Sequence, residues 1–233
     1  FVMSLWDFLF PPVCPHCGAS VATQGDWCET CFNDLLHIRH VPHKFLHYVD
    51  DVCVLADYCG GLKSMIYDVK FNEKKEQSKG AAPFLASYNF YMNYDEPNII
   101  KGNCKTIYDY IVPVPSSEMK KKKRGYNQVD LFFKKWAYSL EKIDKGYFVW
   151  LDCIYKFDTS NDMWSLTHKE RHQNIENAFV IKAEYKDIEF STKRILIVDD
   201  IYTTGATIEA VAKVLRSYNP SRLDALTLAS GSF

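Results

Sequence analysis

The sequence predicts an α/β protein with a mostly parallel sheet, helices on both faces of it, and a small metal-binding module at the N-terminus. Two observations predict the sheet. Apolar runs alternate with amphipathic stretches from Asp51 onward, and a continuous apolar run over 194–198 leads into two carboxylates and a turn that opens a helix. A third observation, two neighbouring Cys-x-x-Cys pairs, predicts the module. We place the module at 1–45 and the α/β domain at 46–233.

The elements of the α/β domain follow from the spacing of apolar residues. Strands are expected where β-branched and aromatic residues cluster, over 51–58, 108–114, 148–155, 194–198 and 223–229. Helices are expected where apolar residues recur at three- and four-residue steps, over 62–71, 81–92, 129–140 and 208–215. Residues 1–40 contain no long periodic segment, and 158–169 are polar and irregular.

Composition narrows the class of protein. Of the 233 residues, 47% are hydrophobic and 24% are charged, which is typical of a globular chain, and the formal net charge is −1. Any affinity for nucleic acid must therefore come from a local patch. No apolar run is long enough for a membrane span, and the segment 1–8 lacks the features of a signal peptide, with Met3 the expected natural start. We expect a cytoplasmic protein, since paired cysteines that bind metal need a reducing compartment.

The most specific motif is Ile195-Leu196-Ile197-Val198-Asp199-Asp200-Ile201-Tyr202-Thr203-Thr204-Gly205-Ala206-Thr207. Backbone N–H groups at the start of a helix bind anions, threonine hydroxyls add donors, and Gly205 permits close approach of a phosphate. The two carboxylates suit the hydroxyls of a ribose. The spacing of a Walker loop is absent. The alternative is a purely structural strand and helix, in which Asp199 or Asp200 caps the helix.

This motif resembles the PRPP-binding signature of type I phosphoribosyltransferases. Two further segments, Pro113-Val114-Pro115 with Arg124–Gln128 and Glu170-Arg171-x-x-Asn174 with Ala178-Phe179, resemble segments of the ComF/GntX competence-related family. Together with the cysteines, the resemblance runs in the same order along nearly the whole chain. The chain departs from the family pattern at Met163-Trp164, where the family commonly has Gln-Thr.

The resemblance implies a role for each matching residue. Asp199 and Asp200 would be the catalytic acidic pair, holding the 2′- and 3′-hydroxyls of PRPP. The 5′-phosphate, or that of a nucleotide, would be cradled by Thr203, Thr204, Gly205, Ala206 and Thr207. The pyrophosphate, with its Mg²⁺, would face a loop and a flexible hood that contribute Pro115, Ser116, Ser117, Arg124 and Arg171. Arg171 has a simple surface arginine as its alternative.

The N-terminal module is expected to bind zinc. Its ligands are two knuckles ten residues apart, Cys14-Pro15-His16-Cys17 and Cys28-Glu29-Thr30-Cys31. Four thiolates at this spacing close a tetrahedral structural site without an open position. Disulfides or free thiols are the alternative. Four histidines are read as linker residues rather than a second metal site: His37, His40, His43 and His47.

Other basic and aromatic residues have less specific interpretations. The run Lys120–Lys123 is either a solvated face or a patch for phosphates or single-stranded DNA. Lys70 resembles a lysine of the family, although a surface lysine is equally compatible with its position. Tyr126 and Trp164 are candidates for stacking on bases, and aromatic residues make up 15% of the chain.

Three functions remain open at this point. The resemblance implies a PRPP-binding protein that assists the uptake or handling of single-stranded DNA in natural competence, together with the competence machinery. The alternative is an active phosphoribosyltransferase that transfers ribose 5-phosphate to a nitrogenous acceptor. A nucleotide-sensing regulator without turnover is a third reading. The sequence does not identify an acceptor or an oligomeric state.

Overall fold

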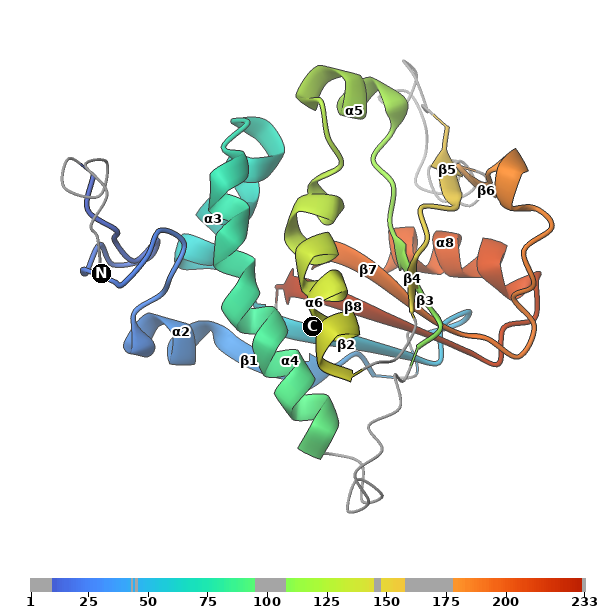
Figure 1. The fold of residues 1–233 in the computed structure, drawn as a ribbon, viewed down its shortest axis with the longest axis horizontal. Helices are drawn as coiled ribbons and strands as arrows, with labels where there is room; N and C mark the ends of the chain where they lie inside the picture. The colour runs from blue at the N-terminus through green and yellow to red at the C-terminus, as the bar shows by residue number, and fades with distance from the viewer. Residues whose placement is uncertain are drawn as a thin grey trace.

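A computed structural model describes residues 10–42, 44, 46–94, 108–144, 148–157 and 178–231. One six-stranded sheet runs through it in the order β1-β2-β8-β7-β3-β4 (Figure 1). Strands β2, β8, β7, β3 and β4 are parallel, and β1 is antiparallel to β2. The predicted α/β class with a mostly parallel sheet is confirmed. The six strands are β1 (Leu36–His40), β2 (Asp51–Asp57), β3 (Tyr110–Pro113), β4 (Val149–Trp150), β7 (Arg194–Tyr202) and β8 (Arg222–Ser230).

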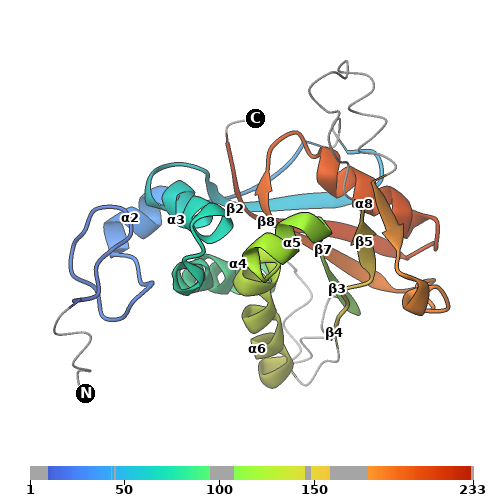
Figure 2. The ribbon, with the colours of Figure 1, turned by 90° about the horizontal axis from the view of Figure 1, so that it is seen from above.

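Helices cover both faces of the sheet because alternate side chains of its strands enter two separate cores. In β7, Ile195 and Ile197 pack in the core beneath α8 (Ala206–Arg216), whereas Leu196 and Val198 pack in the other core. That second core lies beneath α3 (Gly60–Phe71), α4 (Ala82–Tyr94) and α6 (Lys135–Asp144). Figure 2 shows α8 on one side of the sheet and the other three helices on the opposite side.

The order of the strands reverses between β3 and β7. From β3 the chain continues to its neighbour β4, whereas from β7 it continues in the other direction to β8. In open α/β sheets such a reversal leaves a crevice outside the carboxyl ends of the two strands, where ligands bind. The candidate ligand site of this fold therefore lies among the residues that follow β3 and those that end β7.

The strand predicted over 148–155 is wrong as a single element. It is two short strands in two different sheets: β4 pairs with β3, and β5 (Ile154–Lys156) pairs antiparallel with β6 (Phe179–Ile181). A tight turn separates them, in which the N–H of Cys153 donates to the carbonyl of Leu151 at 2.9 Å. Apolar residues lie on both sides of this turn. Their pattern alone therefore does not distinguish two short strands from one continuous strand.

The long apolar face predicted over 129–140 is buried as expected, with Phe132, Phe133 and Ala137 at most 3% exposed. The helix begins, however, with a π-helical turn η4 (Asp130–Lys134) before α6. Short helical elements that were not predicted are α2 (Glu29–Leu35), η2 (Lys75–Ala81), α5 (Glu118–Arg124) and η5 (Ala183–Tyr185).

The N-terminal segment is tied to the sheet. After an isolated bridge between Val13 and Ser20, α2 begins directly at the second cysteine knuckle and leads into β1, the edge strand of the main sheet. The boundary near residue 45 stays a prediction. Within the parts of the chain that the structure describes, no helix combines the length and the hydropathy needed to cross a membrane.

Candidate functional site

Asp199 and Asp200 lie near the carboxyl end of β7, in a strand that continues to Tyr202. Alternation along the strand directs Asp200 toward α3 and Asp199 toward the α8 face. Asp200 Oδ1 accepts a hydrogen bond from Lys70 Nζ at 2.8 Å, and this is an ion pair. Asp200 Oδ2 is buried and has no hydrogen-bond partner among the described residues. One carboxylate oxygen is therefore left for a donor that the described part of the chain does not supply.

Burial and the neighbouring charge of Asp200 raise the pKa of Asp199 to about 7, and the Lys70 ammonium opposes that rise. Asp199 and Asp200 are only 8% and 3% exposed, so each carboxyl group has little contact with water. The N–H of Asp200 donates to Asp199 Oδ1 at 2.9 Å, which fixes the orientation of that carboxyl group. Near neutral pH Asp199 can therefore hold a proton and act as a hydrogen-bond donor.

The turn after β7 has the form of an anion site. Gly205 adopts φ +77°, and a Cβ atom there would lie 2.5 Å from the Tyr202 hydroxyl, so the position requires glycine. Thr203 and Thr204 are exposed, and Thr204 Oγ1 accepts the N–H of Ala206 at 3.4 Å. The turn opens α8, whose first backbone N–H groups have no partner within the helix.

The loop after β3 lies beside this turn, because β3 and β7 are neighbours in the sheet. The N–H of Val114 donates to the carbonyl of Val198 at 2.9 Å. Ser116 Oγ donates to Gln128 Oε1 at 2.7 Å, and an Arg124 guanidinium nitrogen donates to the same oxygen at 3.0 Å. Gln128 thus joins two of the predicted pyrophosphate residues. The other two residues of the predicted loop, Pro115 and Ser117, are partly exposed and buried, respectively.

A pocket lies between the loop after β3 and the β5–β6 ribbon. Its lining includes Pro115 and Ser116, three lysines, and the acidic residues Glu118 and Asp152, of which Asp152 pairs with Lys182 at 2.8 Å. The lysines are Lys121 of α5, Lys156 of β5 and Lys182 just after β6. The charge of Lys156 also lowers the pKa of Asp199, although less than burial and Asp200 raise it. Neither Lys156 nor Lys182 was predicted, because an isolated lysine near a strand carries no pattern.

The structure bears on the interpretations of Lys70 and Tyr126, but not on those of Arg171 and Trp164. Lys70, for which a surface position was equally compatible, is part of the acidic site through its ion pair with Asp200. Tyr126 is not available for stacking on a base: its ring is 8% exposed, and its hydroxyl donates to the carbonyl of Val69 at 2.6 Å. Arg171 and Trp164 lie outside the described residues, so their predicted roles stay predictions.

The two cysteine knuckles come together in space. The Sγ atoms of Cys14, Cys17, Cys28 and Cys31 all lie within 4.8 Å of one another, and those of Cys17 and Cys28 are 3.6 Å apart. Tetrahedral zinc with Zn–S bonds of about 2.3 Å requires sulfur atoms separated by roughly 3.8 Å, so the cluster fits the ion. Burial opposes ionisation of Cys14, but the N–H groups of Cys17, Cys28 and His16 outweigh it and lower the pKa of this thiol to about 6.

The described linker histidines have other partners. His40 Nδ1 is 2.7 Å from Asp51 Oδ2, and its Nε2 is 3.1 Å from the Tyr91 hydroxyl. His37 Nδ1 lies 3.5 Å from Asp57 Oδ1. Among the residues that the structure describes, the four cysteines are the cluster of metal-binding side chains, while His43 lies outside those residues.

Two family models match this chain, one over the N-terminal cysteine module and one over the C-terminal part of the α/β domain. A family model described as a double zinc ribbon domain matches residues 5–42, and one described as a phosphoribosyl transferase domain matches residues 151–232. The first match contains the cysteine cluster. The second contains the β5–β6 ribbon, β7, α8 and β8.

Curated relatives match over most of the chain. Competence protein F of Haemophilus influenzae is 25% identical over 224 residues, covering 94% of this chain and 84% of the relative. DNA utilization protein YhgH of Salmonella typhimurium is 24% identical over 212 residues, covering 87% and 77%, and its Escherichia coli K12 counterpart is 22% identical. Among solved structures, a hypoxanthine phosphoribosyltransferase of Staphylococcus aureus is 11% identical, covering 88% of this chain and 73% of that one, with a TM-score of 0.27, too low to align individual residues.

Proposed function

From the premise that this chain belongs to the ComF family, we propose that it binds PRPP at the carboxyl ends of β7 and β3 and assists the handling of single-stranded DNA in natural competence. The observation that carries the PRPP proposal is the juxtaposition of three chemically distinct parts at one edge of the sheet. These are the buried acidic pair, the glycine turn that opens α8, and the loop after β3.

Each part suits a different group of PRPP. The acidic pair suits the ribose hydroxyls, because the free Oδ2 of Asp200 needs a donor and a protonated Asp199 can donate. The turn Thr203–Thr207 suits the 5′-phosphate through backbone and hydroxyl donors. The loop Pro115–Ser117, with Lys121 and Lys156 of the adjoining pocket, suits the pyrophosphate, whereas Lys182 already pairs with Asp152. Mg²⁺ would accompany the pyrophosphate and neutralise part of its charge.

Zinc is proposed as the structural metal of the N-terminal module. The four cysteines that would hold it leave no position for water, so the ion would supply folding energy rather than catalysis. The separation of the sulfur atoms supports this assignment. Thiolates that bind zinc need a reducing compartment, which supports a cytoplasmic location.

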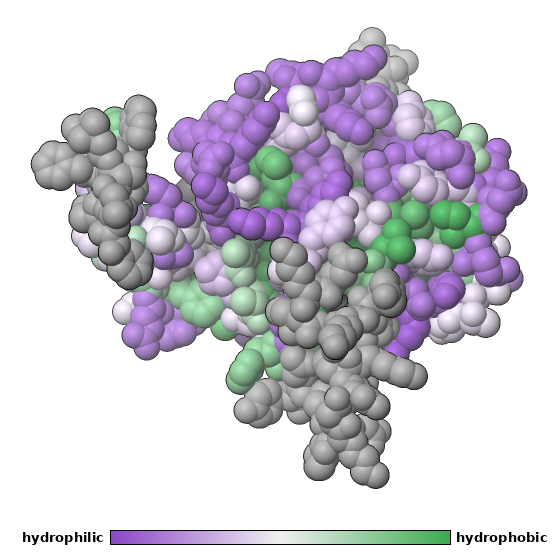
Figure 3. All heavy atoms as spheres, viewed as in Figure 1, coloured by the Kyte–Doolittle hydropathy of each residue, from purple (hydrophilic) through white to green (hydrophobic). Residues whose placement is uncertain are grey.

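Single-stranded DNA is proposed to contact the surface formed by α5 and the end of α3. The basic run Lys120–Arg124 forms most of α5, and its lysines are exposed. Beside it, the rings of Tyr67 and Phe71 are in tilted contact, with centroids 4.8 Å apart, and both residues are more than half exposed; the Arg124 guanidinium lies 5.3 Å from the Phe71 ring. Figure 3 shows hydrophilic surface over α5. Positive charge beside exposed aromatic rings suits a flexible polyanion with stacking bases.

A second candidate function is an active phosphoribosyltransferase, and the pKa of Asp199 favours it. A carboxyl group that titrates near neutral pH can accept the proton that a nitrogenous acceptor loses when it attacks the ribose. Release of pyrophosphate in the presence of PRPP, Mg²⁺ and a panel of bases would distinguish turnover from binding alone.

The proposed function is tested by calorimetric titration of the zinc-loaded protein with PRPP and Mg²⁺. The wild type should bind, and the double variant D199N/D200N should lose at least tenfold in affinity, because two hydrogen bonds to ribose hydroxyls are weakened. D187N, which changes an exposed aspartate away from the site, is the matched control and should bind like the wild type. Equal affinities of the double variant and the control would exclude the acidic pair as the ribose site.

A further inference from the structure

His16 lies inside the first cysteine knuckle and contacts the start of α3. Its Nδ1 atom accepts the backbone N–H of Gly61 at 2.8 Å. A Cβ atom at Gly60 would collide with the His16 ring, and one at Gly61 would lie 2.7 Å from the carbonyl oxygen of Pro15. The two glycines that open α3 therefore leave the space in which the knuckle packs against the helix.

Helix α3 has no side-chain cap from its own N-cap residue. Its N-cap residue, Cys59, is extended and makes no side-chain capping hydrogen bond. The first N–H groups of a helix have no partner within it, and glycines in the first turn weaken it further. His16, from another part of the chain, supplies the hydrogen-bond acceptor that a serine or aspartate side chain at the N-cap would normally supply.

The other end of α3 reaches the acidic pair. Lys70 lies in the last turn of the helix, and its Nζ is 2.8 Å from Asp200 Oδ1. Between the two ends, one face of the helix is buried at 2% exposure or less, through Leu62, Met65, Ile66 and Val69. A packed helix of 12 residues moves as a unit, so a shift at its start is carried to Lys70.

A second contact holds the same module against the segment that follows α3. The indole Nε1 of Trp27 donates to the carbonyl of Gly80 in η2 at 2.9 Å. A Cβ atom at Gly80 would lie 3.3 Å from that nitrogen and 2.6 Å from the sulfur of Met65, which itself belongs to α3. The module thus contacts both the helix and the turn that leads away from it.

We propose that His16 is a positioning residue: it caps α3 from within the cysteine module and thereby sets the position of Lys70 against Asp200. The cysteine cluster holds the backbone on both sides of His16, so the module and the acidic pair are coupled through one rigid helix. The consequence for ligand affinity rests on the proposed PRPP function. The position of Lys70 can be measured without any ligand.

The test uses the zinc-loaded full chain with the variants H16N and H16Q. An asparagine amide oxygen occupies the place of histidine Nδ1, whereas a glutamine amide lies at the place of Nε2 and cannot accept from Gly61. H16Q should weaken PRPP binding about fivefold, the usual effect of losing a cap, and H16N should bind within twofold of the wild type. Zinc content should stay at the wild-type level in both variants, because His16 is not a ligand.

The ligand-free readout is the titration of the Asp199 carboxyl carbon by NMR. Asp200, Lys70 and Lys156 are the charged groups that act on Asp199, and Lys70 lowers its pKa. Displacing Lys70 should therefore move the Asp199 titration to higher pH in H16Q and leave it unchanged in H16N. In a Lys70→Met background, H16Q should have no further effect.

An Asp199 titration that is the same in H16Q and wild type would overturn the proposal, as would a shift that persists in the Lys70→Met background. If H16Q loses zinc, the Asp199 titration should instead be compared between wild type and H16A, which removes the same acceptor without adding bulk. Failure of the wild type to bind PRPP would contradict the proposed function, while the carboxyl titration would still decide the role of His16.

Discussion

Asp199 and Asp200 are adjacent in a buried strand, and Lys70 pairs with Asp200 alone. Burial of Asp199 and the charge of the neighbouring Asp200 favour the state in which Asp199 keeps its proton, and the Lys70 ammonium opposes this only in part. The chemistry of the site at neutral pH therefore depends on a proton as well as on the geometry. Asp199, with a pKa of about 7, is therefore the residue whose protonation should be followed as pH changes.

Asp199 should make the protein less stable as pH rises. Its pKa in the folded state, about 7, is above the ordinary aspartate value of about 3.9 in the unfolded chain. Between these values the folded state holds a proton that the unfolded state has lost, so the free energy of unfolding falls as pH increases. Urea unfolding at pH 5 and pH 7 should show a larger loss for the wild type than for D199N. An equal loss in both proteins would contradict the raised pKa.

Gly205 should be more sensitive to substitution than another glycine with the same backbone conformation. Gly205 and Gly125 both have φ +77°, but only Gly205 has the Tyr202 hydroxyl in the way of a Cβ atom. We expect G125A to cost about 1 kcal/mol of unfolding free energy from the left-handed conformation alone, and G205A roughly 2 kcal/mol or more. Chemical denaturation of both variants measures the difference, and equal costs would show that the tyrosine does not enforce glycine.

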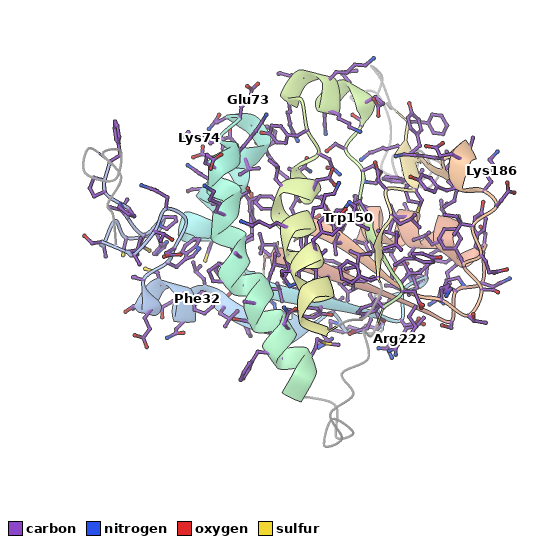
Figure 4. All side chains as sticks on the ribbon, in the orientation of Figure 1. Phe32, Glu73, Lys74, Trp150, Lys186 and Arg222 are labelled. Carbon is purple, nitrogen blue, oxygen red and sulfur yellow. The ribbon has the colours of Figure 1, made fainter. Side chains whose placement is uncertain are left out.

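At the scale of single elements, α5 is a short basic helix at the edge of the site. Figure 4 shows Glu73 and Lys74, between α3 and η2, on the same side of the molecule as α5, whereas Arg222 at the start of β8 lies far from them. Basic side chains of α5 therefore lie next to the proposed PRPP site rather than at the other end of the strands.

Binding of single-stranded DNA should depend on α5 in a salt-dependent manner. Each phosphate contact on a single strand contributes about 0.7 to the slope of log affinity against log salt. Replacing the four lysines of Lys120–Lys123 with glutamine should reduce that slope by up to roughly 3 if each lysine contacts one phosphate, measured by fluorescence anisotropy with an oligothymidine. K186Q, which changes an exposed lysine directly after η5, is the control and should leave the slope unchanged. A slope that does not change in the α5 variant would exclude this surface.

The elements that could be predicted from sequence are the ones with a strong period or a strong motif. Strand β7 and helix α8 carry both, and the helix with Phe132 and Phe133 has a clear apolar face. Helix α5 was missed because a lysine run has no apolar period. The break between β4 and β5 was missed because Leu151 and Cys153 are both buried on either side of the turn.

The site could be predicted only where its residues are contiguous in sequence. The turn Thr203–Thr207 and the acidic pair form one motif, and the structure brings the predicted loop after β3 beside them. Lys70 pairs with Asp200 across a sequence separation of 130, and Lys156 and Lys182 reach the pocket from the β5–β6 ribbon. Such contacts are created by strand order, which the local pattern does not contain.

At the scale of the whole molecule, the N-terminal module and the sheet form one structure. Trp27 packs edge-on against Phe84 of α4, with ring centroids 5.5 Å apart, and the core on that face contains Cys14, Cys31 and Leu35 together with residues of the sheet. Loss of the module should therefore expose part of the main core and not only a peripheral loop.

Removing a ligand of the proposed zinc site should destabilise the whole chain. C28S should lose bound zinc and lower the melting temperature by several degrees, because binding energy of a structural metal is folding energy. C153S replaces a buried cysteine far from the cluster in sequence and should keep zinc. Metal analysis with a thermal scan measures both effects. Full zinc content in C28S would contradict the four-cysteine site.

The most direct test of the central claim is hydrogen–deuterium exchange of the zinc-loaded protein with and without PRPP and Mg²⁺. The account predicts that PRPP slows exchange in peptides covering Thr203–Thr207 and Pro115–Ser117, because these backbone segments face the phosphates, and leaves the amino end of β8 near Arg222 unchanged. Protection at Arg222, or no protection in either loop at saturating PRPP, would contradict a PRPP site at the carboxyl ends of β7 and β3.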